Sequence, residues 1–66
     1  MIQYIYEKQI IPNLDEIHNK VTNSEMESNL INYCRWDEKS KILRIYFTNE
    51  LSENDKNILD SIVQTV

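Results

Sequence analysis

The first eight residues, MIQYIYEK, place apolar or aromatic side chains at every second position, beginning with Ile2, Tyr4 and Tyr6. Period-two spacing of β-branched and aromatic residues is typical of a strand, which we expect over Met1–Lys8. Pro12 then ends the extended run, because its ring fixes φ and removes a backbone donor.

A narrow apolar stripe after Pro12 predicts a short helix over Asn13–Asn23. Its members follow the spacing i, i+3 and i+7 and are Leu14, Ile17 and Val21. Asn13 is the expected N-cap, and Glu16 three residues later is placed to reach back to the Asn13 backbone. The polar stretch that follows holds one large apolar residue, Met26, which we expect to be buried under its neighbours.

Two further apolar runs, Leu30–Trp36 and Lys41–Thr48, predict a hairpin around the loop Asp37–Ser40. In the expected register Trp36 faces Lys41 and Cys34 faces Leu43. One face then carries Leu30, Asn32, Cys34, Leu43, Ile45 and Phe47, and we assign this face to the core. The other face carries Ile31, Tyr33, Arg35, Ile42, Arg44 and Tyr46. A slip of one residue would exchange the two faces.

The C-terminal segment has the clearest helical pattern of the chain. Ser52 is the expected N-cap, with Asp55 as the acidic partner of a capping box. The apolar stripe that follows consists of Ile58, Leu59, Ile62, Val63 and Val66. The element order is therefore β-α-β-β-α over residues 1–66, which predicts a single α+β domain with an antiparallel hairpin and both helices packed on one sheet face.

Composition narrows the classes of function. The net charge is −4 and no basic stripe runs along the chain, so we expect no nucleic-acid binding. We also expect no membrane span, since no apolar run approaches the ~20 residues needed, and no signal peptide at the N-terminus. A single cysteine, Cys34, and a single histidine, His18, exclude an internal disulfide and a structural zinc site built from these residues.

No set of residues indicates catalysis, so we expect no enzyme, no cofactor and no metal. His18 has no nucleophile or acid partner in the pattern, and Cys34 has no neighbour that would lower its pKa. A chain of 66 residues buries little surface, and such chains often depend on partner subunits for stability. We therefore expect protein partners, including further copies of the chain itself in a homo-oligomer.

The aromatic residues supply the candidate interface, because Tyr, Trp and Arg are the residue types that anchor protein contacts. We expect Tyr33 and Arg44 to be cross-strand neighbours that stack. The alternative explanation of these aromatic residues is cross-strand pairing that stabilises the hairpin. The candidate interface residues are Tyr4, Tyr6, Tyr33, Trp36, Arg44 and Tyr46. The first strand, if unpaired along one edge, is a second candidate, because it would join a partner sheet by edge addition.

The segment ILRIYFTNELSENDKNILDSIV resembles small structural proteins of tailed phages, in which an apolar strand leads into a Leu-Ser cap and a Leu-Asp-x-Ile-Val helix. Upstream, Leu14-Asp15-Glu16-Ile17 is similar to a short helix that precedes the strands in those proteins. Unlike them, this chain has no glycine in the hairpin turn and no histidine after the last helix. The resemblance implies a non-enzymatic virion component, a capsid decoration or accessory module, assembled in the host cytoplasm.

The alternative is a cytoplasmic acidic regulator or inhibitor that binds a basic protein, which the charge of −4 favours. The two hypotheses differ in one measurable property. Binding of an acidic regulator weakens steeply with salt, whereas binding by apolar burial changes little.

Overall fold

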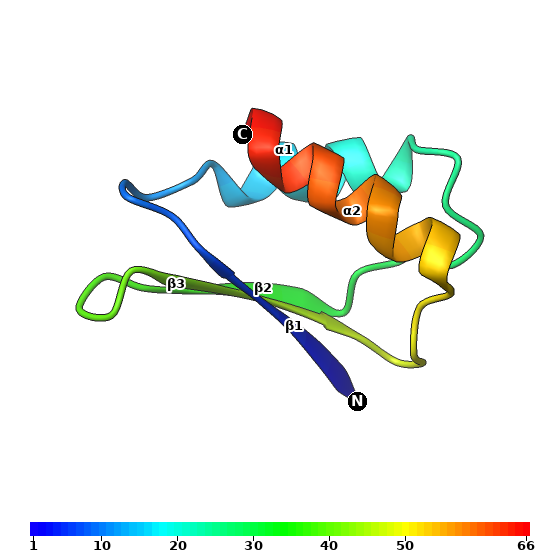
Figure 1. The fold of residues 1–66 in the computed structure, drawn as a ribbon, viewed down its shortest axis with the longest axis horizontal. Helices are drawn as coiled ribbons and strands as arrows, with labels where there is room; N and C mark the ends of the chain where they lie inside the picture. The colour runs from blue at the N-terminus through cyan, green and yellow to red at the C-terminus, as the bar shows by residue number, and fades with distance from the viewer.

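The computed structural model describes all residues 1–66 and confirms the β-α-β-β-α order. The elements are β1 (Ile2–Glu7), α1 (Leu14–Thr22), β2 (Tyr33–Asp37), β3 (Ile42–Phe47) and α2 (Glu53–Thr65). Figure 1 shows both helices on the same side of the sheet, so the protein has one layer of strands and one layer of helices. This is the predicted α+β architecture. Neither helix is long and apolar enough to cross a bilayer.

The three strands form one antiparallel sheet in the order β1-β3-β2. The hairpin strand β3 is central, and the N-terminal strand β1 returns along its other side, where Tyr4 lies opposite Ile45. The sheet therefore has two edges, one formed by β1 and one by β2. Helix α1 connects these two edge strands and lies with α2 above the same face (Figure 1).

The predicted hairpin register is wrong, because the loop lies one residue further along the chain than expected. Trp36 lies opposite Leu43 and Cys34 lies opposite Ile45, so the loop is Glu38–Lys41 rather than Asp37–Ser40. The reason is the turn chemistry: the Asp37 side chain accepts the N–H groups of the second and third loop residues, and Lys41 adopts φ 58°. Moving a loop by one residue shifts each cross-strand partner by two, so the strand residues from Tyr33 to Phe47 keep the faces predicted for them.

The start of β2 also differs from the prediction. The strand begins at Tyr33, and the preceding residues leave the sheet toward the helices. Ile31 is buried in the core with 7% exposure, whereas Leu30 is 75% exposed, the reverse of the predicted faces. An irregular segment does not follow the period-two rule on which that prediction depended.

Both predicted helices begin where their caps are. The Asn13 Oδ1 accepts the N–H of Glu16 at 3.0 Å, and the Ser52 Oγ accepts the N–H of Asp55 at 3.2 Å. Glu16 does not reach back to the Asn13 backbone, and forms an ion pair with Lys20 one turn later at 3.3 Å.

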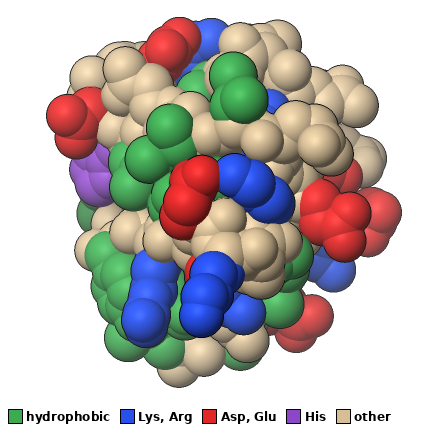
Figure 2. Space-filling view, turned by 90° about the vertical axis from the view of Figure 1, so that its left-hand side faces the viewer, with side chains coloured by type: hydrophobic (Ala, Val, Ile, Leu, Met, Phe, Trp, Pro, Cys, Tyr) green, Lys and Arg blue, Asp and Glu red, His purple; other side chains and the backbone are tan.

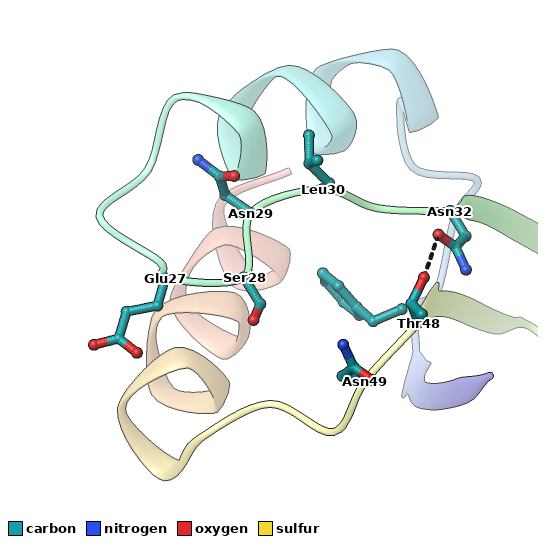
Figure 3. Close-up of a pocket in the computed structure, with 8 residues that line it drawn as sticks. Glu27, Ser28, Asn29, Leu30, Asn32, Thr48 and Asn49 are labelled. Carbon is teal, nitrogen blue, oxygen red and sulfur yellow. Dashed lines mark hydrogen bonds between the residues drawn. The ribbon is translucent and has the colours of Figure 1, made fainter.

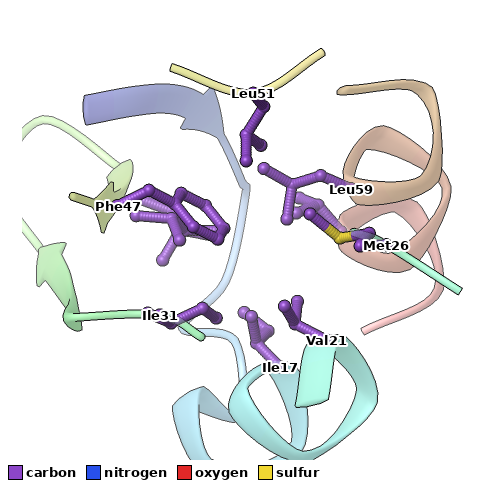
Figure 4. Close-up of a cluster of buried hydrophobic side chains, with 10 residues drawn as sticks. Ile17, Val21, Met26, Ile31, Phe47, Leu51 and Leu59 are labelled. Atoms are coloured by element: carbon purple, nitrogen blue, oxygen red, sulfur yellow. The ribbon is translucent and has the colours of Figure 1, made fainter. Parts of the chain in front are cut away.

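The core lies between the sheet and the helices, as Figure 4 shows. Phe47 and Leu51 approach from β3 and the segment after it, and Leu59 approaches from α2. Met26 is buried at 4% exposure, as expected. The ten buried hydrophobic residues are Ile17, Val21, Met26, Ile31, Leu43, Ile45, Phe47, Leu51, Leu59 and Val63.

Asp55 is the one charged residue inside the protein, with 1% exposure. Its two carboxylate oxygens accept the backbone N–H groups of Glu27 and Ser28, each at 3.1 Å. The predicted capping box is therefore half right. The Ser52 cap is present, but the Asp55 side chain faces inward and ties the long loop between α1 and β2 to the first turn of α2.

Candidate functional site: the open face of the sheet

The face of the sheet opposite the helices is covered by no other element. Since Leu43, Ile45 and Phe47 point into the core, the intervening residues of β3 point away from it. The register sets each of them between one residue of β1 and one of β2. We call this surface the open face; its three rows are Gln3–Tyr46–Tyr33, Ile5–Arg44–Arg35 and Glu7–Ile42–Asp37.

The first row contains a stacked aromatic pair. The rings of Tyr33 and Tyr46 lie 4.3 Å apart with 20° between their planes. Stacked pairs of this kind contribute about 0.5–1.5 kcal/mol beyond their buried area. Tyr33 was expected to stack on Arg44, and that prediction is wrong because Tyr46, not Arg44, lies directly opposite Tyr33. Tyr33 remains 46% exposed, so one side of the stacked pair is open to a partner.

The second row places two like charges opposite each other. Arg35 pairs with Arg44 across β2 and β3, and neither guanidinium forms an ion pair. Like charges directly opposite in a sheet destabilise it slightly. The field of Arg44 contributes to the lowered pKa of Asp37 in the third row, although the largest cause there is the hydrogen bond from the Ser40 N–H. Two guanidinium groups with free donors therefore lie beside the tyrosine pair.

Charged side chains lie beside hydrophobic surface at the hairpin end of the molecule (Figure 2). Figure 2 views the protein from this end, and Lys and Arg side chains gather in the lower half, on the sheet side, next to hydrophobic surface. In the turn itself Lys41 forms an ion pair with Glu38 at 2.6 Å, which with the Trp36 indole lowers the pKa of Glu38.

Three of the six candidate interface residues lie on the other face of the sheet. Tyr4 packs edge-on against Phe47 at 5.8 Å, and its hydroxyl accepts the N–H of Leu51 at 2.7 Å. The six residues therefore do not all lie on one face of the sheet. The register places Tyr4 opposite Ile45, on the side that the helices cover.

Tyr6 and Trp36 also have partners inside the molecule. The Tyr6 hydroxyl donates to Asp60 at 2.7 Å, and burial together with this carboxylate raises the Tyr6 pKa. The Trp36 Nε1 donates to Glu38 at 2.7 Å. The residues that remain available on the open face are Tyr33, Arg44 and Tyr46, and the structure adds Arg35 and Ile5, which sequence patterns alone did not single out.

A polar depression lies between the α1–β2 loop and the end of β3 (Figure 3). Asn32 and Thr48 lie next to each other at one side of it (Figure 3), and the Thr48 hydroxyl donates to the Asn32 side chain at 3.0 Å. Its lining combines amide, hydroxyl and carboxylate groups with two hydrophobic side chains; the residues are Glu27, Ser28, Asn29, Leu30, Asn32, Phe47, Thr48 and Asn49. Such a lining offers hydrogen bonds to a polar group, and Leu30 and Phe47 add apolar surface beside them.

The two residues considered as candidates for reactivity are His18 and Cys34. His18 is exposed on α1. Cys34 is half-buried on the helix side of β2, and this burial raises the pKa of its thiol to about 11. No three His, Cys, Asp or Glu residues lie close enough together to hold a metal ion.

Comparison with known proteins leaves the structure as the main guide to function. No protein-family model matches the chain, and neither the curated proteins nor the solved structures contain a match.

Proposed function

We propose that the protein is a non-enzymatic interaction protein that binds other protein subunits through its open face. The observation that supports this most strongly is the stacked Tyr33–Tyr46 pair beside two arginines without ion pairs, on a sheet face that neither helix covers. Tyrosine and arginine dominate the anchors of protein interfaces, because each combines a large apolar surface with directed donors. The helix layer holds this face rigid from behind.

We further propose that these subunits belong to a virus particle, in which the chain acts as a decoration or accessory module. The support is the similarity of the segment from Ile42 to Val63 to small virion proteins of tailed phages. In the structure this segment comprises β3, the connection of residues 48–52, and most of α2. This connection brings α2 back over one face of the sheet, and the opposite face is covered by neither helix.

The test is to replace both rings of the stacked pair, as Tyr33→Ser with Tyr46→Ser, and to separate native cell extracts by size. The wild-type protein should run in a fraction far above twice its 8.0 kDa mass, and the double variant should not. The control is the double variant Ile11→Ser with Leu30→Ser, which removes two exposed apolar residues outside the open face and should behave as the wild type. Far-UV circular dichroism should show equal helix content in all three. If the tyrosine variant remains in the large fraction, the open face is not the binding surface.

An acidic regulator that binds a basic protein is the second candidate, and one feature favours it. Four exposed glutamates lie in the α1–β2 loop and around the start of α2, and none of them forms an ion pair. They are Glu25, Glu27, Glu50 and Glu53. Replacing all four by glutamine would abolish binding if this candidate is correct and would leave it intact if the open face is the contact.

A further inference from the structure

The outer edge of β1 carries backbone hydrogen-bonding groups without partners in the sheet. The Lys8 N–H donates to the Lys41 carbonyl, and Lys8 and Lys41 are the next opposite pair after Glu7 and Ile42. In an antiparallel pair, residues alternate between facing the neighbouring strand and facing away from it. The even-numbered residues of β1 therefore bond to β3, and Gln3, Ile5 and Glu7 direct their N–H and C=O groups outward.

Exposed apolar side chains are concentrated in and around β1, at the N-terminal end of the sequence. Of the seven large hydrophobic residues that are most exposed, five belong to residues 1–11; they are Met1, Ile2, Ile5, Ile10 and Ile11. Ile5, at the centre of β1, is 53% exposed. A six-residue edge strand with an apolar centre and no proline is the kind of edge that pairs with another strand. The other edge strand, β2, carries the charge of Arg35 at its centre instead.

We propose that the β1 edge binds the β1 edge of a second copy of this chain. The two strands run antiparallel around a two-fold axis through Ile5, which makes the contact the same on both subunits. The outward groups of Ile5 then bond to those of the partner's Ile5, and Gln3 bonds to the partner's Glu7 in both directions. The product is a continuous six-stranded sheet with all four helices on one side.

The side chains of the open face select this register. With the axis at Ile5, the two isoleucines meet and cover each other, and the Gln3 amide lies opposite the partner's Glu7 carboxylate as a hydrogen-bond donor. The two Glu7 carboxylates are then separated by about four residues along the strands, roughly 13 Å, which is beyond the screening length of about 10 Å at 0.1 M salt. An axis at Glu7 would set two carboxylates directly opposite. An axis at Gln3 would leave Glu7 beyond the paired strands.

This contact extends the proposed function without depending on it. The dimer joins the two open faces edge to edge, so that two Tyr33–Tyr46 pairs lie on one surface. The tyrosines themselves take no part in the pairing of β1. A failure of the tyrosine variant to bind a larger assembly would therefore leave the dimer intact, and loss of the dimer would leave each open face unchanged.

The test is sedimentation equilibrium of the purified chain over a dilution series, with two variants of one residue. Gln3→Lys places opposite charges at two symmetric positions of the contact, and Gln3→Glu places like charges there. Cross-strand pairs of this kind change the dissociation constant in opposite directions, each by about two- to thirtyfold when both copies are counted. Ile5→Lys places two ammonium groups on the axis and should leave only monomer. Ile11→Lys changes an isoleucine outside β1 that is more exposed than Ile5; it is the control and should dimerise as the wild type does.

The expected result is a concentration-dependent dimer that Gln3→Lys strengthens and Gln3→Glu weakens. The proposal is overturned if the wild-type chain is monomeric up to roughly millimolar concentration. It is equally overturned if a dimer forms but the two Gln3 variants shift it in the same direction or not at all. Because the Gln3 pair tests the register by itself, the conclusion stands even if Ile5→Lys fails to fold.

Discussion

Replacing the buried carboxylate of Asp55 should destabilise the protein more than replacing any exposed acidic residue. Asp55 accepts two backbone N–H groups at 3.1 Å, from Glu27 and Ser28, and is 1% exposed. In Asp55→Asn one oxygen becomes an amide N–H that faces a backbone N–H, so one bond is lost and two donors oppose each other. Hydrogen bonds to a charged group contribute about 1.5–3 kcal/mol each. We therefore expect Asp55→Asn to lower the free energy of unfolding by about 2–3 kcal/mol.

Asp55→Ala removes both bonds and should cost about 2–4 kcal/mol, rather than twice the cost of Asp55→Asn. The two N–H groups belong to exposed residues, so they reach water once the loop lifts from α2. The loss of stability in Asp55→Ala is then limited to the free energy needed to release the loop together with the buried Met26. A domain of this length has a total stability of roughly 3–10 kcal/mol, so either change removes a large share of it.

Urea unfolding at fixed protein concentration measures this loss. With a slope m near the low end of the usual range, about 1 kcal/mol/M, the midpoint of Asp55→Asn should fall by about 2–3 M with m unchanged. The matched control is Glu53→Gln, an exposed carboxylate in the same turn, which should cost at most about 1 kcal/mol through the helix dipole. Amide hydrogen exchange adds a local readout, because the Glu27 and Ser28 amides should lose protection. Equal midpoints for the two variants would refute the structural role of Asp55.

Four further predictions concern Tyr4, Cys34 and Lys41. Tyr4→Phe leaves the part-buried Leu51 N–H without its acceptor and should lower the free energy of unfolding by about 1–3 kcal/mol in a urea titration. The Cys34 thiol, with a pKa of about 11, should react with a disulfide reagent near pH 8 about twentyfold more slowly than a free cysteine, after allowing for its greater intrinsic nucleophilicity. The raised pKa also means that stability falls as the pH rises from about 8.5 to about 11, and Cys34→Ala should flatten that fall in a series of urea titrations. Lys41, at φ 58°, tolerates asparagine but not a β-branched residue, so Lys41→Val should be less stable than Lys41→Asn by about 1–2 kcal/mol in thermal unfolding.

Most of the fold could be predicted because local signals and burial agree. The caps at Asn13 and Ser52 and the apolar stripe from Ile58 to Val66 are short-range features, and the structure confirms them. Alternation along β3 also identified the core face correctly. The loop of the hairpin was misplaced because no glycine or Asn-Gly pair marks the turn, and the side chain of Asp37 supplies that signal instead.

The candidate site could be predicted only in part, because its definition depends on which face of each strand the helices cover. Alternation grouped Tyr4 with Tyr6, but it does not reveal that both lie opposite core residues of β3. The same long-range pairing brings Ile5 beside Arg44 on the open face. The inward orientation of Asp55 depends on a loop 27 residues away in sequence, and capping alone explained that residue beforehand.

The central claim, that the open face is the binding surface, is tested most directly by footprinting Tyr33 and Tyr46. Hydroxyl-radical labelling should be compared between the purified chain and the native assembly, with the exposed His18 as an internal reference. We predict that labelling of both tyrosines falls several-fold in the assembly while that of His18 is unchanged. Equal labelling of Tyr33 and Tyr46 in the two states would contradict the claim.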